Sequence, residues 1–296
     1  MKRLLPLIFL LVLGHITYAQ SDSIYGAEII RQLSSPEFKG RGYNQHGDSI
    51  AAEYLREQLR LLKVTPLGDN YYQHYSVNPQ YIRNVYNPYP TPYHSQNVVG
   101  KVEGKSDSMI VFTAHYDHLG IDSNGVLYPG AHDNASGCGA VMALAKWAKG
   151  EQIQSVLPYT IIVMLFSGEE AGLFGSLYAS MNPLIDYSKV KLLVNIDMFC
   201  GGDEGLMVEG GEHPQAVPLV ERMIQANAEQ HLAIEIKQRK NAPNSDHYPF
   251  TPLCPSIFIY TLGGPYGGYH SPKDTFEGCG LAHFNDYLSL IKLMAK

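Results

Sequence analysis

The sequence has no excess of positive charge, no Gly-, Ser- or Pro-rich linker, and no repeat. Its 296 residues include 22 Lys and Arg against 28 Asp and Glu, which gives a formal net charge of -6. A chain without a basic surface is a poor partner for nucleic acid, so that class of function is disfavoured. At 45% hydrophobic and 17% charged residues, the composition is that of a globular protein, and one domain is the simplest interpretation.

Cysteine is scarce and lacks the C-x-x-C spacing that marks many zinc and redox sites. The four residues are Cys138, Cys200, Cys254 and Cys279. In an exported protein they could form disulfides, but the sequence allows three connectivities and does not choose among them. Buried thiols are an equally good interpretation, and we do not assign any of the four to a metal.

The N-terminus has the pattern of an export signal. Two basic residues precede the apolar run Leu4–Leu13, and a small-x-small pattern ends at Ala19, so residues 1–19 are predicted to be a signal peptide. A membrane anchor is disfavoured because the run is shorter than the roughly 20 residues that span a bilayer, and Pro6 interrupts it. We expect a mature chain, residues 20–296, that is periplasmic or extracellular and not bound to membrane after cleavage.

Apolar, β-branched segments alternate with helical patterns from residue 97 onward. This rhythm predicts an α/β fold, with a single mixed, mostly parallel sheet flanked by helices on both faces. A tyrosine- and proline-rich segment, residues 70–93, is expected to be extended or irregular. The predicted strands are 97–102, 110–114, 160–166, 191–196, 206–209, 234–237 and 256–261; the predicted helices are 24–33, 49–62, 140–149, 175–181, 217–231 and 282–294.

Polar residues gather where the predicted strands end. They are His115, Asp133, the pair Glu169 and Glu170, Asp197, and His270 in a glycine-rich loop. A single carboxylate after a strand is commonly a helix cap or a surface charge. Several at neighbouring strand ends could instead point into one cleft, at the edge where α/β folds keep their chemistry. Imidazole nitrogen and carboxylate oxygen are ligands that suit zinc.

Six motifs in this order resemble a known family. HYDHLG, AHDNASG, SGEEAGLFGS, NIDM, SDHYPF and GGYHSPKDT look like those of the M28 zinc aminopeptidases, which are two-zinc exopeptidases. The upstream LSSPEFKGRG and AAEYLREQLRLLKVTPLGDN resemble the secreted bacterial branch of that family. The resemblance covers nearly all of the mature chain and implies the zinc-dependent exopeptidase fold, with residues 20–296 forming an M28-like peptidase domain.

The resemblance implies two zinc ions held by five side chains. Asp133 would bridge the two ions. His115 and Asp197 would complete the ligands of one ion, and Glu170 and His270 those of the other. With so few protein ligands for each ion, coordination positions stay open for water, as a catalytic zinc site requires.

Catalytic roles follow for three neighbours of these ligands. Glu169 would be the general base that takes a proton from the activated water and passes it to the leaving amine. Asp117 would contact the second imidazole nitrogen of His115 and fix its tautomer. Tyr269 could donate a hydrogen bond to the oxyanion of the tetrahedral intermediate, although a packed tyrosine is nearly as good an interpretation.

Further polar residues beside the motifs are assigned less direct roles. The resemblance places Ser245, Asp246 and His247 on the substrate side of the site, in the pocket wall or behind the ligands. His118 and His132 are not predicted to bind metal. Position 132 is often Asp in the family, so its histidine is a departure that leaves the bridging Asp133 in place.

The expected function is removal of N-terminal residues from peptides, with a peptide as the partner and no prediction of oligomeric state. The alternative is a glutaminyl cyclase, a single-zinc acyltransferase on a related fold. The cyclase resemblance rests on HYD and GEEA, whereas DNASG and the short SGEEAGLFGS, which lacks a Trp-bearing insertion, favour the aminopeptidase. A non-catalytic binding protein is disfavoured by the complete ligand set, and a carboxypeptidase or dipeptidase by the lack of an added domain.

Overall fold

The computed structural model describes residues 22–77, 93–264 and 268–296. The predicted signal peptide and the greater part of the tyrosine-rich segment lie outside these residues. Among the helices that the structure describes, none has the length and hydrophobicity that a membrane crossing requires.

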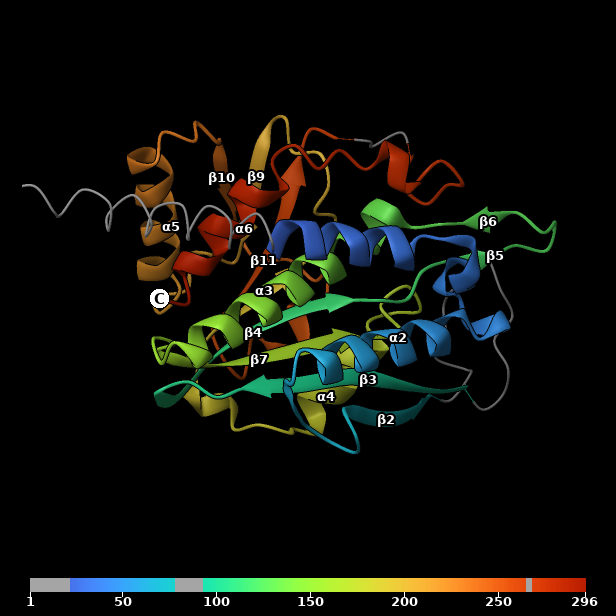
Figure 1. Ribbon diagram of the computed structural model, residues 1–296, viewed down its shortest axis with the longest axis horizontal. Helices are drawn as coiled ribbons and strands as arrows, with labels where there is room; N and C mark the ends of the chain where they lie inside the picture. The colour runs from blue at the N-terminus through green and yellow to red at the C-terminus, as the bar shows by residue number, and fades with distance from the viewer. Residues whose placement is uncertain (1–21, 78–92, 265–267) are drawn as a thin grey trace, which may run out of the picture.

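A nine-stranded sheet forms the centre of the described chain, with strand order β1-β3-β7-β4-β8-β11-β9-β10 and β2 paired to β3 (Figure 1). The core strands β7, β4, β8 and β11 are parallel to one another. Strands β3 and β9 flank them in antiparallel orientation. The strands are β1 (Thr65–Pro66), β2 (Tyr72–Val77), β3 (Tyr93–Val102), β4 (Ser106–His115), β7 (Tyr159–Phe166), β8 (Val190–Ile196), β9 (Gly205–Glu209), β10 (Ile236–Arg239) and β11 (Ser256–Leu262).

Helices cover both faces of this sheet. One face carries the helix over residues 22–33 together with α2 (Gly47–Leu61), α3 (Ser136–Ile153), α5 (Val217–Glu229) and α6 (Phe284–Leu293). The opposite face is covered by α4 (Phe174–Met181) and by the short turns η5 (Tyr187–Lys189) and η6 (Tyr248–Phe250). The predicted α/β architecture with a single mixed sheet is therefore confirmed.

The alternation of side chains along the core strands explains this layering. In β7, Ile161, Val163 and Leu165 pack into the larger apolar cluster, under the helices of the first face. Their neighbours Ile162 and Met164 point the other way, into the cluster beneath α4. Because successive side chains of a strand face opposite sides, a strand that is apolar throughout must lie in the middle of a three-layer structure.

The predicted elements from residue 97 onward are present, with shifted ends. Strands β3 and β4 each begin four residues earlier than predicted, and β10 runs Ile236–Arg239 instead of 234–237. Helix α3 is longer than predicted, spanning Ser136–Ile153, because its first turn is built from the small residues that follow Asp133. The sequence did not predict the edge strands β1 and β2, or the hairpin of β5 (Gly120–Ile121) and β6 (Leu127–Tyr128).

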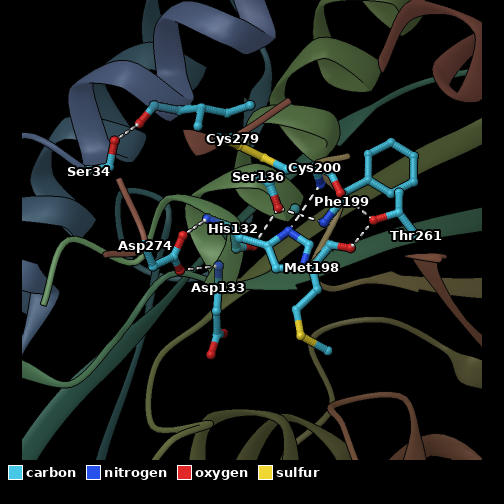
Figure 2. Close-up of a disulfide and its surroundings, with 12 residues drawn as sticks. Ser34, His132, Asp133, Ser136, Met198, Phe199, Cys200, Thr261, Asp274 and Cys279 are labelled. Carbon is cyan, nitrogen blue, oxygen red and sulfur yellow. Dashed lines mark hydrogen bonds between the residues drawn. A yellow bond between two sulfur atoms is a disulfide. The ribbon is translucent and has the colours of Figure 1, made fainter. Parts of the chain in front are cut away.

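A disulfide joins Cys200 to Cys279, while Cys138 and Cys254 are free and buried (Figure 2). It links the loop after β8 to the turn η8 (Phe276–Gly278), which follows the loop of His270. The backbone of Gly201 donates a hydrogen bond to Gly280 O over 2.6 Å beside the bridge. Both interpretations of the cysteines are thus realised, two as a disulfide and two as buried thiols.

Replacing Cys200 and Cys279 together by serine should lower the free energy of unfolding by about 2–4 kcal/mol, because a bridge between residues 79 apart restricts the unfolded chain. Urea unfolding followed by circular dichroism measures the change. Reductant should bring the wild type toward the double variant and leave the double variant unaffected. Equal stability of the two oxidised proteins would contradict the expectation.

Candidate metal centre

Adjacent parallel strands deliver the candidate residues to one edge of the sheet. Strand β4 lies between β7 and β8, and His115 at its end is paired in register with Phe166, the last residue of β7. Ser167 to Glu170 follow β7, and Asp197 follows β8. The carboxyl ends of these strands therefore bring a histidine and the predicted carboxylates together, as the sequence predicts.

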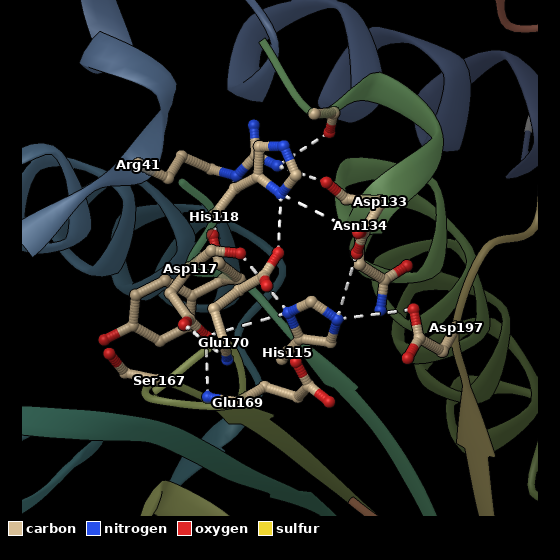
Figure 3. Close-up of polar contacts among 12 residues, drawn as sticks. Arg41, His115, Asp117, His118, Asp133, Asn134, Ser167, Glu169, Glu170 and Asp197 are labelled. Carbon is tan, nitrogen blue, oxygen red and sulfur yellow. Dashed lines mark hydrogen bonds and ion pairs between the residues drawn. The ribbon is translucent and has the colours of Figure 1, made fainter. Parts of the chain in front are cut away.

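His115, Asp133 and Asp197 form the first candidate group. His115 Nε2 lies 3.4 Å from Asp133 Oδ1 and 3.3 Å from Asp197 Oδ1 (Figure 3). All three residues are buried, and their candidate ligand atoms lie within 4.8 Å of one another. They come from β4, from the turn η4 (Ala131–Ala135) and from the end of β8.

Asp133, Glu170 and His270 form the second group around the other oxygen of the same aspartate. His270 Nε2 lies 3.1 Å from Asp133 Oδ2 and 3.2 Å from Glu170 Oε2. Asp133 thus turns Oδ1 toward the first group and Oδ2 toward the second, which is the arrangement that a bridging carboxylate needs.

These separations fit zinc. Around a tetrahedral zinc with bonds of about 2.0–2.1 Å, neighbouring ligand atoms are about 3.3 Å apart. The nitrogen–oxygen separations in both groups, 3.1 to 3.4 Å, are close to this value. The donor set of imidazole and carboxylate also matches the metal, so the residues present could hold one ion in each group.

Neighbouring side chains of opposite charge shift the pKa values of the residues in the cluster. Burial opposes protonation of His115, but Asp197 and Glu169 outweigh it and raise the pKa well above 6.5. Burial likewise opposes ionisation of Asp133, but hydrogen bonds from His115 and His270 hold its pKa well below 3.8. Without metal, imidazolium protons therefore balance the carboxylate charge, and metal binding must release these protons.

Asp117 contacts the second imidazole nitrogen of His115, as predicted, and it also holds a neighbouring loop. His115 Nδ1 lies 3.2 Å from the main-chain carbonyl oxygen of Asp117 and 3.7 Å from its carboxylate. The carboxylate instead accepts hydrogen bonds from the Tyr43 hydroxyl at 2.7 Å and from the backbone N–H groups of Glu169 and Glu170, both at 3.2 Å. Asp117 therefore fixes His115 through its carbonyl, and it fixes the loop of Glu169 and Glu170 through its side chain.

Ser245 supports Asp197 from behind. Its hydroxyl donates to Asp197 Oδ2 over 2.9 Å and accepts from the side-chain amide of Asn195 at 2.8 Å. The carbonyl oxygen of that amide accepts from Thr113 on the neighbouring strand. Since Oδ2 is engaged by Ser245, Oδ1 is the oxygen that faces His115.

Asp246 and His247, which the sequence places on the substrate side with Ser245, are also fully buried. His247 Nε2 pairs with Asn241 Oδ1 at 2.7 Å and lies 3.5 Å from the buried carboxylate of Glu209. Burial lowers the pKa of His247 to about 4, so the ring is neutral near neutral pH. These contacts favour the interpretation that Ser245 and His247 lie behind the ligands, whereas the charge of Asp246 acts on Glu169.

Two charged residues that the sequence analysis did not single out hold the backbone at Asp133. Arg41 is fully buried and donates to the carbonyl oxygens of Gly130 and Asp133, at 2.6 and 3.2 Å. Asp274 accepts from the backbone N–H groups of His132 and Asp133, at 2.7 and 3.0 Å (Figure 2). Both lie inside motifs given above, LSSPEFKGRG and GGYHSPKDT. Charged residues are rarely buried without partners, so burial would have indicated their roles, but the sequence does not show that they are buried.

Glu169 lies next to Glu170 but has a different environment. Desolvation, with further contributions from Glu170, Asp197 and Asp246, raises its pKa well above 4.5, although His115 opposes the shift. No hydrogen bond of its carboxylate to another described residue is found, whereas both oxygens of Glu170 face imidazoles. A carboxylate with a raised pKa beside a metal site is suited to proton transfer.

The remaining candidates lie at the margin of the cluster. The ring of Tyr269 is half exposed and stacks on His270, with ring centroids 3.9 Å apart. His132 is buried, and its Nδ1 accepts from the backbone N–H of Cys200, away from the metal groups. His118, which was not predicted to be a ligand, lies with Nδ1 2.8 Å from Glu170 Oε1.

Known proteins with similar sequences are peptidases. The chain is 34% identical over 185 residues to a protein of Pyrenophora tritici-repentis named "Probable zinc metalloprotease", a match that covers 58% of this chain and 34% of the relative. It is 27% identical over 184 residues to "Leucine aminopeptidase 1" of Arthroderma gypseum, covering 61% of this chain and 46% of that one. The matches thus span between about a third and a half of the length of these relatives.

Solved structures share the fold. A leucine aminopeptidase precursor from Bacteroides thetaiotaomicron superposes with a TM-score of 0.68 at 18% identity, covering 93% of this chain and 94% of the other. A glutaminyl cyclase of Porphyromonas gingivalis gives 0.72 at 17% identity, over 92% and 97%. BSAP, a zinc aminopeptidase from Bacillus subtilis, gives 0.70 at 15% identity, over 92% and 94%. At these identities the likeness establishes the fold alone.

The family follows from a match between the chain and a model of the whole family. The model "Peptidase family M28" matches residues 97–292, about two thirds of the 296-residue chain. The matched region runs from β3 to α6 and contains all the candidate ligands. The chain therefore belongs to peptidase family M28.

Proposed function

We propose that the protein is a zinc-dependent aminopeptidase that removes N-terminal residues from peptides. The observation that carries the proposal is the position of Asp133, whose Oδ1 lies 3.4 Å from His115 and whose Oδ2 lies 3.1 Å from His270. Two complete groups of donors therefore share one carboxylate. The names of the similar fungal and bacterial proteins, "Leucine aminopeptidase 1" and a zinc aminopeptidase, support the same substrate class.

Two zinc ions, one in each group, are part of this proposal. His115 and Asp197 would hold one ion, Glu170 and His270 the other, and Asp133 both. Three carboxylates against two dications leave a small positive excess, which favours an electron-rich ligand at the open positions. When bound, zinc polarises a carbonyl and lowers the pKa of a coordinated water.

The side chains of this chain supply proton transfer and orientation. Glu169, whose carboxylate has no hydrogen-bond partner among the described residues, would take the proton from the attacking water and give it to the leaving amine. Asp117 would keep Glu169 in place through its hydrogen bond to the Glu169 backbone N–H. Tyr269, half exposed beside His270, remains a candidate donor to the oxyanion.

A glutaminyl cyclase is the second candidate, because cyclases are among the structural neighbours. A single-zinc enzyme needs only one of the two donor groups. In this chain both groups have their donors, and Ser245 also orients Asp197 in the group of His115. The presence of two donor groups favours the two-zinc hydrolase.

We also propose that the protein acts outside the cytoplasm, in the periplasm or the extracellular space. The proposal is supported by the signal pattern of residues 1–19 and by the Cys200–Cys279 disulfide, because disulfides persist mainly in oxidising compartments. Peptides are the partners expected there.

Glu169→Gln should leave zinc content unchanged and lower kcat by about 100- to 10,000-fold, because an amide cannot accept the proton. Zinc content by mass spectrometry and hydrolysis of a panel of aminoacyl anilides measure the two effects. Glu170→Gln is the matched control, since it should lose zinc affinity instead. Near-normal turnover by Glu169→Gln would refute the proposed base, and cyclisation of glutaminyl peptides without anilide hydrolysis by the wild type would establish the alternative.

Asp133→Ala should remove most bound zinc, because both donor groups lose the shared carboxylate. The expected content falls from about two ions per chain in the wild type to well below one. Asp107→Ala is the control: this exposed carboxylate lies at the opposite end of β4 from His115 and pairs with Lys189, so its loss should leave zinc content unchanged. Retention of two ions by Asp133→Ala would show that Asp133 does not bridge them.

A further inference from the structure

His118 was not predicted to bind metal, yet its ring contacts two of the predicted metal ligands. Its side chain is fully buried three residues after His115, and its Nδ1 lies 2.8 Å from Glu170 Oε1 and 3.9 Å from Asp133 Oδ2. The same three residues form a candidate metal group. His118 is therefore either a further metal ligand or a residue that holds Glu170 in position.

The ring of His118 has little freedom to move. A Cβ at position 130 would lie 2.5 Å from its Cδ2, so glycine is the residue that lets the ring pack against this turn. The ring also meets His270 edge to face, with centroids 5.9 Å apart, and the His118 backbone N–H donates to Arg41 O over 3.3 Å. The contact to Glu170 is thus fixed by packing on several sides.

The second ring nitrogen distinguishes the two roles. A neutral imidazole carries hydrogen on one nitrogen only. If Nδ1 bound a metal, Nε2 would carry the hydrogen, and that buried atom has no hydrogen-bond partner among the described residues. Metal-binding histidines almost always donate from the other nitrogen, and buried N–H groups without acceptors are rare. If Nδ1 instead donates to Glu170, only an acceptor is left without a partner.

Glu170 is held by different partners on its two oxygens. Oε1 faces His118, while Oε2 lies 3.2 Å from His270 Nε2, on the side of Asp133 Oδ2. A carboxylate can bind a metal through one oxygen or through both. Figure 3 shows the contact between His118 and Glu170. A hydrogen bond to Oε1 would direct that oxygen away from an ion and leave Oε2 as the ligand.

We propose that His118 is a positioning residue that donates Nδ1–H to Glu170 Oε1, restricts Glu170 to a single coordinating oxygen, and so keeps a coordination position open for water or substrate. The inference rests on the proposed zinc function. It assigns to His118 the same kind of role that Ser245 has for Asp197, whose second oxygen is also engaged by a donor.

Three substitutions separate a donor from a ligand. In His118→Asn the amide nitrogen is bonded to Cγ, as Nδ1 is in histidine, so the donor is retained without the imidazole. His118→Gln carries the same amide one carbon further out, and His118→Ala removes the donor. The full chain is freed of metal and titrated with Zn²⁺ in competition with a chromophoric chelator, and the visible spectrum of the Co²⁺ form reports the ligands.

Loss of a residue that orients a metal ligand typically weakens metal affinity by about 10–100-fold, and we expect this for His118→Ala and His118→Gln at one of the two zinc sites. His118→Asn should stay within about threefold of the wild type and keep its Co²⁺ spectrum. Thermal unfolding of the metal-free proteins checks that folding is intact. If the alanine variant does not fold, the comparison of asparagine with glutamine decides.

Two outcomes would overturn the proposal. If asparagine weakens binding as much as alanine and changes the Co²⁺ spectrum, His118 is a ligand. If alanine leaves both the affinities and the spectrum unchanged, His118 has no role toward the metal. The readout is binding, so a wild-type protein that binds zinc but hydrolyses no peptide would refute the proposed function and leave the assignment of His118 standing.

Discussion

Asp133 must present its two carboxylate oxygens to two different imidazoles while almost fully buried, and much of the surrounding structure serves this requirement. A side chain can be aimed this closely only if its backbone is fixed. Arg41 binds carbonyl oxygens on one side of the turn, and Asp274 binds N–H groups on the other. A buried charge is costly without partners. Arg41 donates to main-chain carbonyl oxygens, including those of Leu33, Tyr116 and Pro129, and the nearby carboxylates of Asp274, Asp133 and Asp117 also favour its charge.

Much of the fold could be predicted from the sequence because the core strands are apolar on both faces. The runs that became β4, β7 and β8 could not lie at a surface, and polar residues directly after them could only meet at the edge of a parallel sheet. That reasoning brings His115, Glu170 and Asp197 together before any coordinates are known. Strand β1 was missed because it contains only two residues. Strand β2 lies in the segment expected to be extended or irregular, but it was not identified as a strand because it lacks such an apolar run.

The supporting contacts could not be predicted, since they depend on which atom of a residue faces which neighbour. The sequence indicates that Asp117 assists His115. It does not show that the main-chain carbonyl of Asp117 makes the shorter contact, while the carboxylate accepts hydrogen bonds from the backbone N–H groups of Glu169 and Glu170. It leaves open whether Ser245 lies in the pocket wall or behind the ligands, and only its hydrogen bonds to Asn195 and Asp197 show that it lies behind Asp197. For His118, the sequence does not show which nitrogen has a partner.

The disulfide should affect the rate at which a bound metal ion is lost. Asp197 and His270 come from loops far apart in the chain, and the Cys200–Cys279 bridge connects the segments that carry them. A ligand that detaches from an ion would therefore remain tethered nearby, and its return is an intramolecular event governed by effective concentration. An oxidising compartment would keep that tether closed, so the surroundings in which the protein works and the retention of its metal are linked by one covalent bond.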